Sequence, residues 1–416
     1  MSLQYHIDQP GDWNQPSRCV IIRGWCFAPN NRPIAGVRLR TTDRTLTGVV
    51  GLPRPDVKAA VPAAPDDNTG FEIRGTLPAG HVHLTFEARL EDGSWAPFFE
   101  RTIRIKRQLL PLWLGGGEWT ELMFFQMPAH MAYPPRPVIP EKFPATRNPA
   151  GRPRFAIVTP SYQQARFLAE TMRSVLDQQP GVDCAYVVQD GGSTDGSAGL
   201  IKRQAARLHA WACERDAGQA DAIAEGFART SGGPDDVMAW INSDDFYLPG
   251  ALGYVADYFA AHPDVDVVYG HRVVVDEESR EIARWFLPPH DPEVLRLNDF
   301  IPQETVFWRR RIWDRVGGLD TSFHFAVDWD LLLRFTAAGA RIVRLPYFLA
   351  CFRSHAAQKT SAVMHSTGQS EITLLRERTQ GRPFPPQELE RDPRLLRYLR
   401  RSAWIEFLWK LGRRAR

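Results

Sequence analysis

The most constraining feature of this sequence is a regular alternation of apolar runs and amphipathic segments that begins after Arg154. FAIVTP, CAYVVQD, HAWACE and DVMAWI are short apolar runs of the kind that form buried strands. Helical patterns separate them, as in FLAETMRSVLDQQ, where Leu168, Met172 and Leu176 share one stripe. This succession predicts an α/β domain with a Rossmann-like, mostly parallel, doubly wound sheet.

Polar residues follow each of these runs at the end where ligands bind to open α/β sheets. They are Ser161 and Tyr162 after the first run, Asp190 to Asp195 after the second, Asp216 after the third, and Ser243 to Asp245 after the fourth. Because the carboxyl ends of parallel strands meet at one edge of the sheet, we expect these side chains to form one site.

The segment QDGGSTDGS follows the second run and contains Asp190 and Asp195. Its two glycines allow a tight turn, and Ser193, Thr194 and Asp195 can cap the helix that follows. Capping explains Asp195 but gives Asp190 no role. A calcium loop is excluded, because glycine and threonine stand where that loop needs Asp or Asn, and there is no GxGxxG dinucleotide motif.

Two adjacent carboxylates, Asp244 and Asp245, end the apolar run VMAWI shortly before the turn Pro249-Gly250. Like charges side by side repel each other, and a Mg²⁺ or Mn²⁺ ion would offset that repulsion and hold ligand phosphates. The alternative is an exposed turn, where Asp is common. With Asp190 on a neighbouring strand, the pattern favours metal-diphosphate binding.

Six motifs in order resemble the family 2 glycosyltransferases with the GT-A fold: TPSY, QDGGSTDGS, ERDAGQADAIAEGF, WINSDDFYLPGAL, AVDWDLLLRF and FRSHAAQKT. The resemblance covers roughly half of the chain. It implies an inverting transfer of a sugar from a nucleotide-diphospho-sugar donor to an acceptor hydroxyl.

The resemblance also implies roles for individual residues. In the nucleotide pocket it places Thr159, Pro160 and Tyr162, with Asp190 accepting a hydrogen bond from the base, most often uracil. Asp216 and Asp221 would border the nucleotide, and Asp244 would contact the ribose or the sugar. Asp245 and His355 would hold the Mn²⁺ or Mg²⁺ ion, although a lone histidine is more often an ordinary surface residue.

Asp328, the first acid of DWD, stands where the family has its catalytic base, which would take the proton of the acceptor hydroxyl. It also begins a helical pattern, where a carboxylate is favoured by the helix dipole. Asp330 is the competing acid, and it would point elsewhere. Gln303 in FIPQETVFW is a further possible contact to donor or acceptor.

One segment departs from the family pattern. Ala224, Glu225 and Gly226 stand where the family commonly has Asn-Lys-Gly, so a methyl group and an anion replace an amide and a cation. This puts the contacts of that helix in question, but it changes neither the metal site nor the base.

The remaining chain predicts four segments. Residues 1–106 read as an all-β accessory sandwich, with Val82, Leu84, Phe86 and Ala88 on one face of a strand, and it could bind glycan, mediate oligomers or brace the enzyme. Residues 107–152 are a Pro-rich linker, 153–362 the glycosyltransferase domain, and 363–416 a basic helical tail.

The C-terminal tail has nine Lys and Arg against two acidic residues from Arg391 onward, a net charge of +7. Trp404, Ile405, Leu408 and Leu411 follow helical spacing within it. A basic amphipathic helix of this kind fits attachment to an anionic membrane surface, and packing of its apolar stripe on the catalytic domain is the equal alternative. Membrane attachment would suit a lipid-linked acceptor.

Composition sets the remaining expectations. The net charge of +3 does not indicate nucleic acid, the five scattered cysteines have neither zinc nor CxxC spacing, and no apolar run approaches the length of a membrane span. We expect a cytoplasmic protein, which is peripheral on the inner face of the cytoplasmic membrane if the tail binds there. We expect it to transfer a sugar, most often from a UDP-sugar donor, in surface polysaccharide assembly. A nucleotide-sugar pyrophosphorylase is one alternative, but it would need a Gly-rich loop after the first strand, where TPSYQQ stands. A non-catalytic glycan-binding or scaffold protein is the other, and it would not need a catalytic base such as Asp328.

Overall fold

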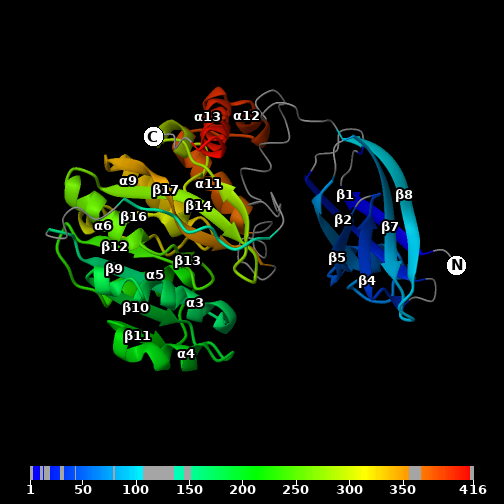
Figure 1. Cartoon of the computed structure of the whole chain (residues 1–416), viewed down its shortest axis with the longest axis horizontal. Helices are drawn as coiled ribbons and strands as arrows, with labels where there is room; N and C mark the ends of the chain where they lie inside the picture. The colour runs from blue at the N-terminus through cyan, green and yellow to red at the C-terminus, as the bar shows by residue number, and fades with distance from the viewer. Residues whose placement is uncertain are drawn as a thin grey trace. The chain divides into compact units, whose positions relative to one another are not determined.

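The computed structural model describes residues 3–9, 13, 19–28, 32–42, 44–77, 80–105, 135–144, 151–355 and 367–412. The chain divides into two compact units, the first containing the strands β1 to β8 and the second containing the strands β9 to β17 with the helices α3 to α13 (Figure 1). The predicted linker lies largely outside the described residues.

The first unit is built from antiparallel strands that follow one continuous hydrogen-bonded order, β1-β2-β6-β5-β4-β7-β8, with β3 beside β2. Its elements are β1 (Gln4–Gln9), β2 (Cys19–Ala28), β3 (Arg32–Pro33), β4 (Gly36–Arg40), β5 (Thr45–Leu52), α1 (Pro55–Ala60), β6 (Gly70–Thr76), β7 (Gly80–Arg89) and β8 (Trp95–Ile105). The sequence patterns had indicated five of these strands and missed β1, β3 and β5.

The sheet of the first unit curls so that its first and last strands meet across an apolar core. The rings of Tyr5 in β1 and Phe98 in β8 lie 5.2 Å apart, although these strands are at opposite ends of the order. Phe98 also lies 5.9 Å from Phe71 of β6. The alternating residues of β7, from Val82 to Ala88, are all buried in this core.

The second unit is an α/β domain around a nine-stranded sheet. Its elements are β9 (Phe155–Ser161), α3 (Ala165–Leu176), β10 (Cys184–Asp190), α4 (Ser197–Gln204), β11 (Ala210–Cys213), α5 (Gln219–Ala228), β12 (Val237–Trp240), β13 (Phe246–Tyr247), α6 (Ala251–Ala261), β14 (Val267–Val275), β15 (Glu281–Trp285), α7 (Pro292–Leu295), β16 (Phe307–Arg309), α8 (Arg310–Val316), α9 (Val327–Ala337), β17 (Ile342–Arg353), α11 (Gln369–Gln380), α12 (Pro386–Arg391) and α13 (Pro393–Lys410).

The sheet of the second unit is parallel in one half and mixed in the other. The strands run in the order β11-β10-β9-β12-β16-β14-β17-β13, and the first four are parallel as the alternating pattern predicted. β16 then pairs antiparallel with both β12 and β14, so the expectation of a mostly parallel sheet holds only for the first half. A fully buried run such as VVYGHRVVV does not encode strand direction, because both arrangements bury it alike.

Both faces of this sheet are covered. Along β9, Phe155 and Ile157 join one apolar cluster with the α3 stripe of Leu168, Met172 and Leu176, while Val158 joins another with α5 and α9. Alternation of this kind is what a doubly wound sheet requires. No helix among the described residues combines the length and apolar character of a bilayer span.

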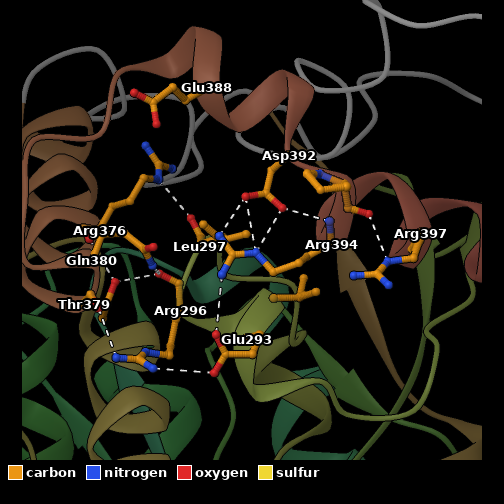
Figure 2. Close-up of polar contacts among 12 residues, drawn as sticks. Glu293, Arg296, Leu297, Arg376, Thr379, Gln380, Glu388, Asp392, Arg394 and Arg397 are labelled. Carbon is orange, nitrogen blue, oxygen red and sulfur yellow. Dashed lines mark hydrogen bonds and ion pairs between the residues drawn. The ribbon is translucent and has the colours of Figure 1, made fainter.

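The C-terminal helices belong to the second unit rather than extending from it (Figure 2). In α11, Arg376 donates to the carbonyl of Leu297, 2.9 Å away, and Thr379 donates to the carbonyl of Arg296. Burial lowers the pKa of Arg376 to about 10. The predicted helical tail is therefore packed along its described length.

Candidate functional site

The ends of β9 and β10 meet at Asp190, which is fully buried. Its carboxylate accepts hydrogen bonds from the Ser161 hydroxyl at 3.0 Å, the Ser193 hydroxyl at 2.8 Å and the Ser193 backbone N–H at 2.8 Å. Asp190 therefore fixes the Gly191-Gly192 turn against the neighbouring strand. Its expected bond to a nucleobase would be made beside this internal network.

Asp195 connects two helix starts at the same edge. Its carboxylate accepts from the N–H of Ala165, the first residue of α3, at 2.7 Å, and from the N–H and hydroxyl of Ser197 at the start of α4. Gln163, in the loop before α3, has a φ of 54° and donates its N–H to the Ser193 hydroxyl. A non-glycine residue in this left-handed region is strained, and here it lies beside the site.

Asp216 lies against the Gly191 turn: a Cβ placed on Gly191 would be 2.9 Å from Asp216 Oδ2. Burial raises the pKa of the Asp216 carboxyl, and the charges of Asp221 and Asp190 raise it further. Asp221 accepts from the N–H of Ala217 at the start of α5. The three carboxylates expected around a nucleotide thus lie in one corner of the sheet edge.

The TPSY segment is divided between core and surface. Thr159 is fully buried, and its hydroxyl pairs with that of Tyr186 at 2.9 Å. Its side chain therefore lies in the core, whereas the sequence had predicted it in the nucleotide pocket. Pro160 is also buried. Tyr162, by contrast, is 63% exposed directly beyond the end of β9, where a ring is available to a ligand.

The two carboxylates after β12 point to different partners. Asp244 Oδ2 lies 2.9 Å from Nε2 of His355, which follows β17. Asp245 is 2% exposed, and its Oδ1 accepts from the backbone N–H of Arg353 at 2.9 Å. This differs from the expectation that Asp245, rather than Asp244, faces the same ligand as His355; Asp244 lies in a turn in which the Asp245 N–H donates to the Asn242 carbonyl, so the two carboxylates have different directions.

Arg353 holds this loop in place. Its guanidinium is 1% exposed and donates to the carbonyl of Asp244, to the Ser279 hydroxyl and to Glu170 of α3. Burial raises the pKa of Asp245 well above its usual range, and the charges of Asp244 and Glu304 add to the effect. Asp245 and Arg353 thus form the buried support beneath the more exposed Asp244.

A chain of amides fixes the other side of the loop. Gln219 of α5 donates to Asn242 Oδ1 at 2.7 Å, and Asn242 donates in turn to Gln303 Oε1 at 3.3 Å. Gln303 then donates to the carbonyl of Trp240 at 2.9 Å. Gln303 is 8% exposed, so it supports the loop from behind, and its contact to donor or acceptor stays a prediction.

The two acids at the start of α9 have distinct environments. Asp330 is 1% exposed and paired with Arg334 and Arg378, whereas Asp328 is half-buried and accepts from the N–H of Trp329. Trp329 points into the core and donates its ring N–H to the carbonyl of Leu295. Of the two acids, Asp328 is thus the more exposed, whereas Arg334 and Arg378 neutralise Asp330.

The start of α9 is held from α11 by Glu371. One carboxylate accepts the backbone N–H groups of His324, Phe325 and Ala326 at 2.7, 2.8 and 2.9 Å. Ala326 is the N-cap residue of α9, so this carboxylate lies at the helix N-terminus, where a negative charge is stabilising. Sequence reasoning missed Glu371, because nothing local to α11 indicates where its side chain lands.

Two further acids near Asp328 were also missed. Burial raises the pKa of Asp299 well above its usual range, and the nearby charge of Asp328 raises it further. Glu304, 1% exposed, pairs with Arg272 at 2.5 Å and connects electrostatically to both Asp245 and Asp299. The acid in FIPQET could have indicated Glu304, but the run resembles an ordinary segment before a strand, so the sequence did not draw attention to it.

The departure at Ala224-Glu225-Gly226 has a structural explanation. Glu225 accepts from the side chain of Gln189 at 2.9 Å, and so bonds α5 to β10. Gly226 is needed for packing, since a Cβ there would lie 2.5 Å from Val158 Cγ1. Both residues are thus committed to holding α5 on the sheet.

Asp244 and His355 fit a divalent cation. A carboxylate oxygen and an imidazole nitrogen are common ligands of Mn²⁺, and such ions often take one or two protein ligands with the rest from substrate phosphates. Within the described residues no three His, Cys, Asp or Glu side chains come together as a metal shell. The two protein ligands would therefore be completed by a diphosphate.

Residues 156–318 match the model of glycosyl transferase family 2. This segment of the chain thus carries a glycosyl transferase family 2 domain. The matched segment runs from β9 through α8 and includes Asp190, Asp216, Asp244 and Asp245, while Asp328 and His355 lie beyond it.

Curated relatives agree with this domain assignment. The O-antigen biosynthesis protein RfbC of Myxococcus xanthus is 29% identical over 233 residues, which cover 54% of this chain and 18% of that protein. A PGL/p-HBAD biosynthesis glycosyltransferase of Mycobacterium bovis is 26% identical over 196 residues, 46% of this chain and 73% of the relative. The chain thus spans less than a fifth of the RfbC protein.

Solved structures with a similar second unit include TarS of Staphylococcus aureus with UDP-GlcNAc, at a TM-score of 0.43 and 16% identity, covering 57% of this chain and 69% of that one. The mannosyltransferase PcManGT of Pyrobaculum calidifontis, with GDP-Man and Mn²⁺, has a TM-score of 0.43 and 17% identity. The match covers 65% of this chain and 73% of that one. At these TM-scores the family match, and not these neighbours, identifies the domain.

Proposed function

We propose that this glycosyltransferase moves a sugar from a nucleotide-diphosphate donor to a hydroxyl of a glycan or lipid-linked glycan, with inversion at the anomeric carbon and with Mn²⁺ or Mg²⁺ as cofactor. The observation that carries the proposal is the pairing of Asp244 with His355 at the same sheet edge as Asp190 and Asp216. Together they would provide a cation site beside carboxylates that can accept hydrogen bonds from a nucleoside.

On the donor side, Tyr162, Asp190, Asp216 and Asp221 would bind the nucleoside, and Asp244 with His355 would hold the cation and the diphosphate. Asp245 would position Asp244 from beneath instead of binding the ion itself, because Arg353 already occupies one of its oxygens. A bound divalent cation would neutralise the charge that grows on the leaving diphosphate. A UDP-sugar is the first donor to test.

On the acceptor side, Asp328 would take the proton of the attacking hydroxyl, a role typically worth about 10² to 10⁴ in rate. Its placing supports this role: α9 presents Asp328 while Arg334 and Arg378 neutralise Asp330. An in-line attack opposite the leaving diphosphate needs one base and no enzyme nucleophile, so the product would have the inverted configuration.

The acceptor belongs, in this proposal, to surface polysaccharide assembly. The names of RfbC and of the mycobacterial relative, both in glycan or glycolipid biosynthesis, support it. The first unit would act as an accessory domain that binds glycan or braces the enzyme. A non-catalytic glycan-binding role is the alternative, and it has no use for the separate environments of Asp328 and Asp330.

The test is release of nucleoside diphosphate from a panel of UDP-, GDP- and dTDP-sugars, with Mn²⁺, with Mg²⁺ and with chelator. Release from one donor, lost with chelator, supports the proposal, and NMR of the product with a hydroxyl acceptor reports inversion or retention. Metal-dependent donor binding without turnover under any acceptor would favour the non-catalytic alternative.

A further inference from the structure

The helix α13 has two different apolar faces. One face packs on the second unit: Leu395 and Tyr398 are each 2% exposed, Ser402 donates to the carbonyl of Phe286, and the ring of Trp409 lies 5.2 Å from that of Phe286. Ile405, one of the apolar tail residues that follow helical spacing in the sequence, lies on this packed face and is 8% exposed. The expectation that the helix packs is therefore met by one of its faces.

The other face of α13 is exposed and is apolar at its C-terminal end. Trp404, Phe407 and Leu411 are 53%, 37% and 58% exposed, at helical spacings of three and four residues. The rings of Trp404 and Phe407 stack, with centroids 5.4 Å apart. Two large aromatic rings stacked on each other in solvent make an unusual concentration of apolar surface for a soluble helix.

Cations continue the same stripe toward the N-terminus of the helix. Arg397, Arg400 and Arg401 are exposed one and two turns before Trp404. No carboxylate of the described residues pairs with Arg400 or Arg401. The single acid in the α13 sequence, Glu406, is half-buried and does not lie on the stripe.

The exposed face is held rigidly. Arg394 in the first turn of α13 pairs with Asp392 at 2.7 Å and with Glu293 beside α7 at 3.4 Å, as Figure 2 shows. The ring of Tyr398 packs at a tilt against that of Phe300, with centroids 4.5 Å apart. With its opposite face fixed in this way, α13 cannot roll to bury Trp404 and Phe407 against its own unit.

We infer that this stripe, Arg397, Arg400, Arg401, Trp404, Phe407 and Leu411, docks the protein on an anionic lipid surface. Tryptophan and phenylalanine partition into the region of lipid headgroups, and arginines on the same face pair with anionic headgroups. A purely apolar partner would leave the arginines without a function, and an acidic protein would not need the stacked rings. The docking surface goes beyond the proposed sugar transfer and does not depend on which sugar is moved.

The test is cosedimentation of the full chain with vesicles of phosphatidylcholine alone and of phosphatidylcholine mixed with phosphatidylglycerol. The wild type is expected to bind the mixed vesicles more strongly, and less so as salt is raised. Replacing Trp404 and Phe407 together by Ser should weaken binding at least about tenfold. Replacing Arg400 and Arg401 together by Gln should weaken it roughly 25-fold, at roughly fivefold per cation, and only on the anionic vesicles.

The matched control is Leu374→Ser, since Leu374 is also an exposed leucine, 56% accessible, but lies on α11. It should leave vesicle binding unchanged. Unchanged binding by both double variants would overturn the inference. So would a smaller oligomer in the Trp404/Phe407 variant, because it would mean that a second copy of the protein, and not lipid, covers the stripe.

Discussion

His355 Nε2 lies 2.9 Å from Asp244 Oδ2, which joins the end of β17 to the loop after β12. The two residues are 111 positions apart in sequence, and the pairing of β13 with β17 brings the loop before β13 beside the end of β17. In the proposed function this carboxylate and imidazole would hold the divalent cation, while Asp245 and Arg353 hold the loop from below.

Replacing Asp328 by Asn should leave donor binding intact and lower kcat by about 10² to 10⁴, because the amide cannot accept the acceptor's proton. Steady-state kinetics with the identified donor would measure the change in kcat. The matched variant is Asp330→Asn, whose residue pairs with Arg334 and Arg378 in the core. That change should lower the free energy of unfolding by about 1–3 kcal/mol and spare kcat; the reverse pattern would assign the base to Asp330.

The sequence motifs located the sheet edge and its acids correctly, since Asp190, Asp216 and Asp244 all lie there. The resemblance assigned Asp245 to the same ion as His355, whereas Asp244 is the residue that contacts His355, because the side-chain directions depend on how Arg353, a residue from a distant strand, holds the loop. Thr159 was placed in the pocket because its motif matched, yet its hydroxyl bonds to Tyr186 in the core. Local patterns give the strand ends, and long-range contacts decide the side-chain directions.

The pKa of Asp245 is raised by burial above the value of 3.8 that an ordinary Asp has. An acid with a raised pKa contributes stability below its unfolded pKa and loses it as pH rises toward the folded pKa. Asp245→Asn removes this dependence and keeps an oxygen for the Arg353 N–H. Urea unfolding without divalent ions should therefore show the variant gaining stability relative to the wild type as pH rises from acidic to neutral, and a gain on acidification would refute the burial argument.

Glu371 accepts three backbone N–H groups before α9, from His324 to Ala326. In Glu371→Gln an amide NH₂ would face one of those donors, so we expect a loss of about 1–2 kcal/mol in the free energy of unfolding. Because α9 carries Asp328, kcat should fall more than donor affinity. Glu377→Gln, the same chemical change on the same helix, is the control. Equal effects from both variants would mean that Glu371 has no special position.

Gly226 allows α5 to approach β9, where a Cβ would meet Val158 Cγ1 at 2.5 Å. Gly226→Ala should destabilise the protein by about 1–3 kcal/mol through overpacking. Adding Val158→Ala removes the clashing methyl groups, so the double variant should be more stable than the sum of the two single effects. Additive losses would show that the contact is relieved elsewhere. Thermal or urea unfolding of the four proteins completes the cycle.

The most direct test of the cation site is calorimetric titration of UDP and GDP in the presence of Mn²⁺ or of chelator. The wild type should bind one nucleotide only with the metal, and Asp244→Asn and His355→Gln should each weaken that binding by at least about 10- to 100-fold. Asp245→Asn should weaken it much less. Equal nucleotide binding with chelator, or full binding by both the Asp244 and His355 variants, would contradict the account.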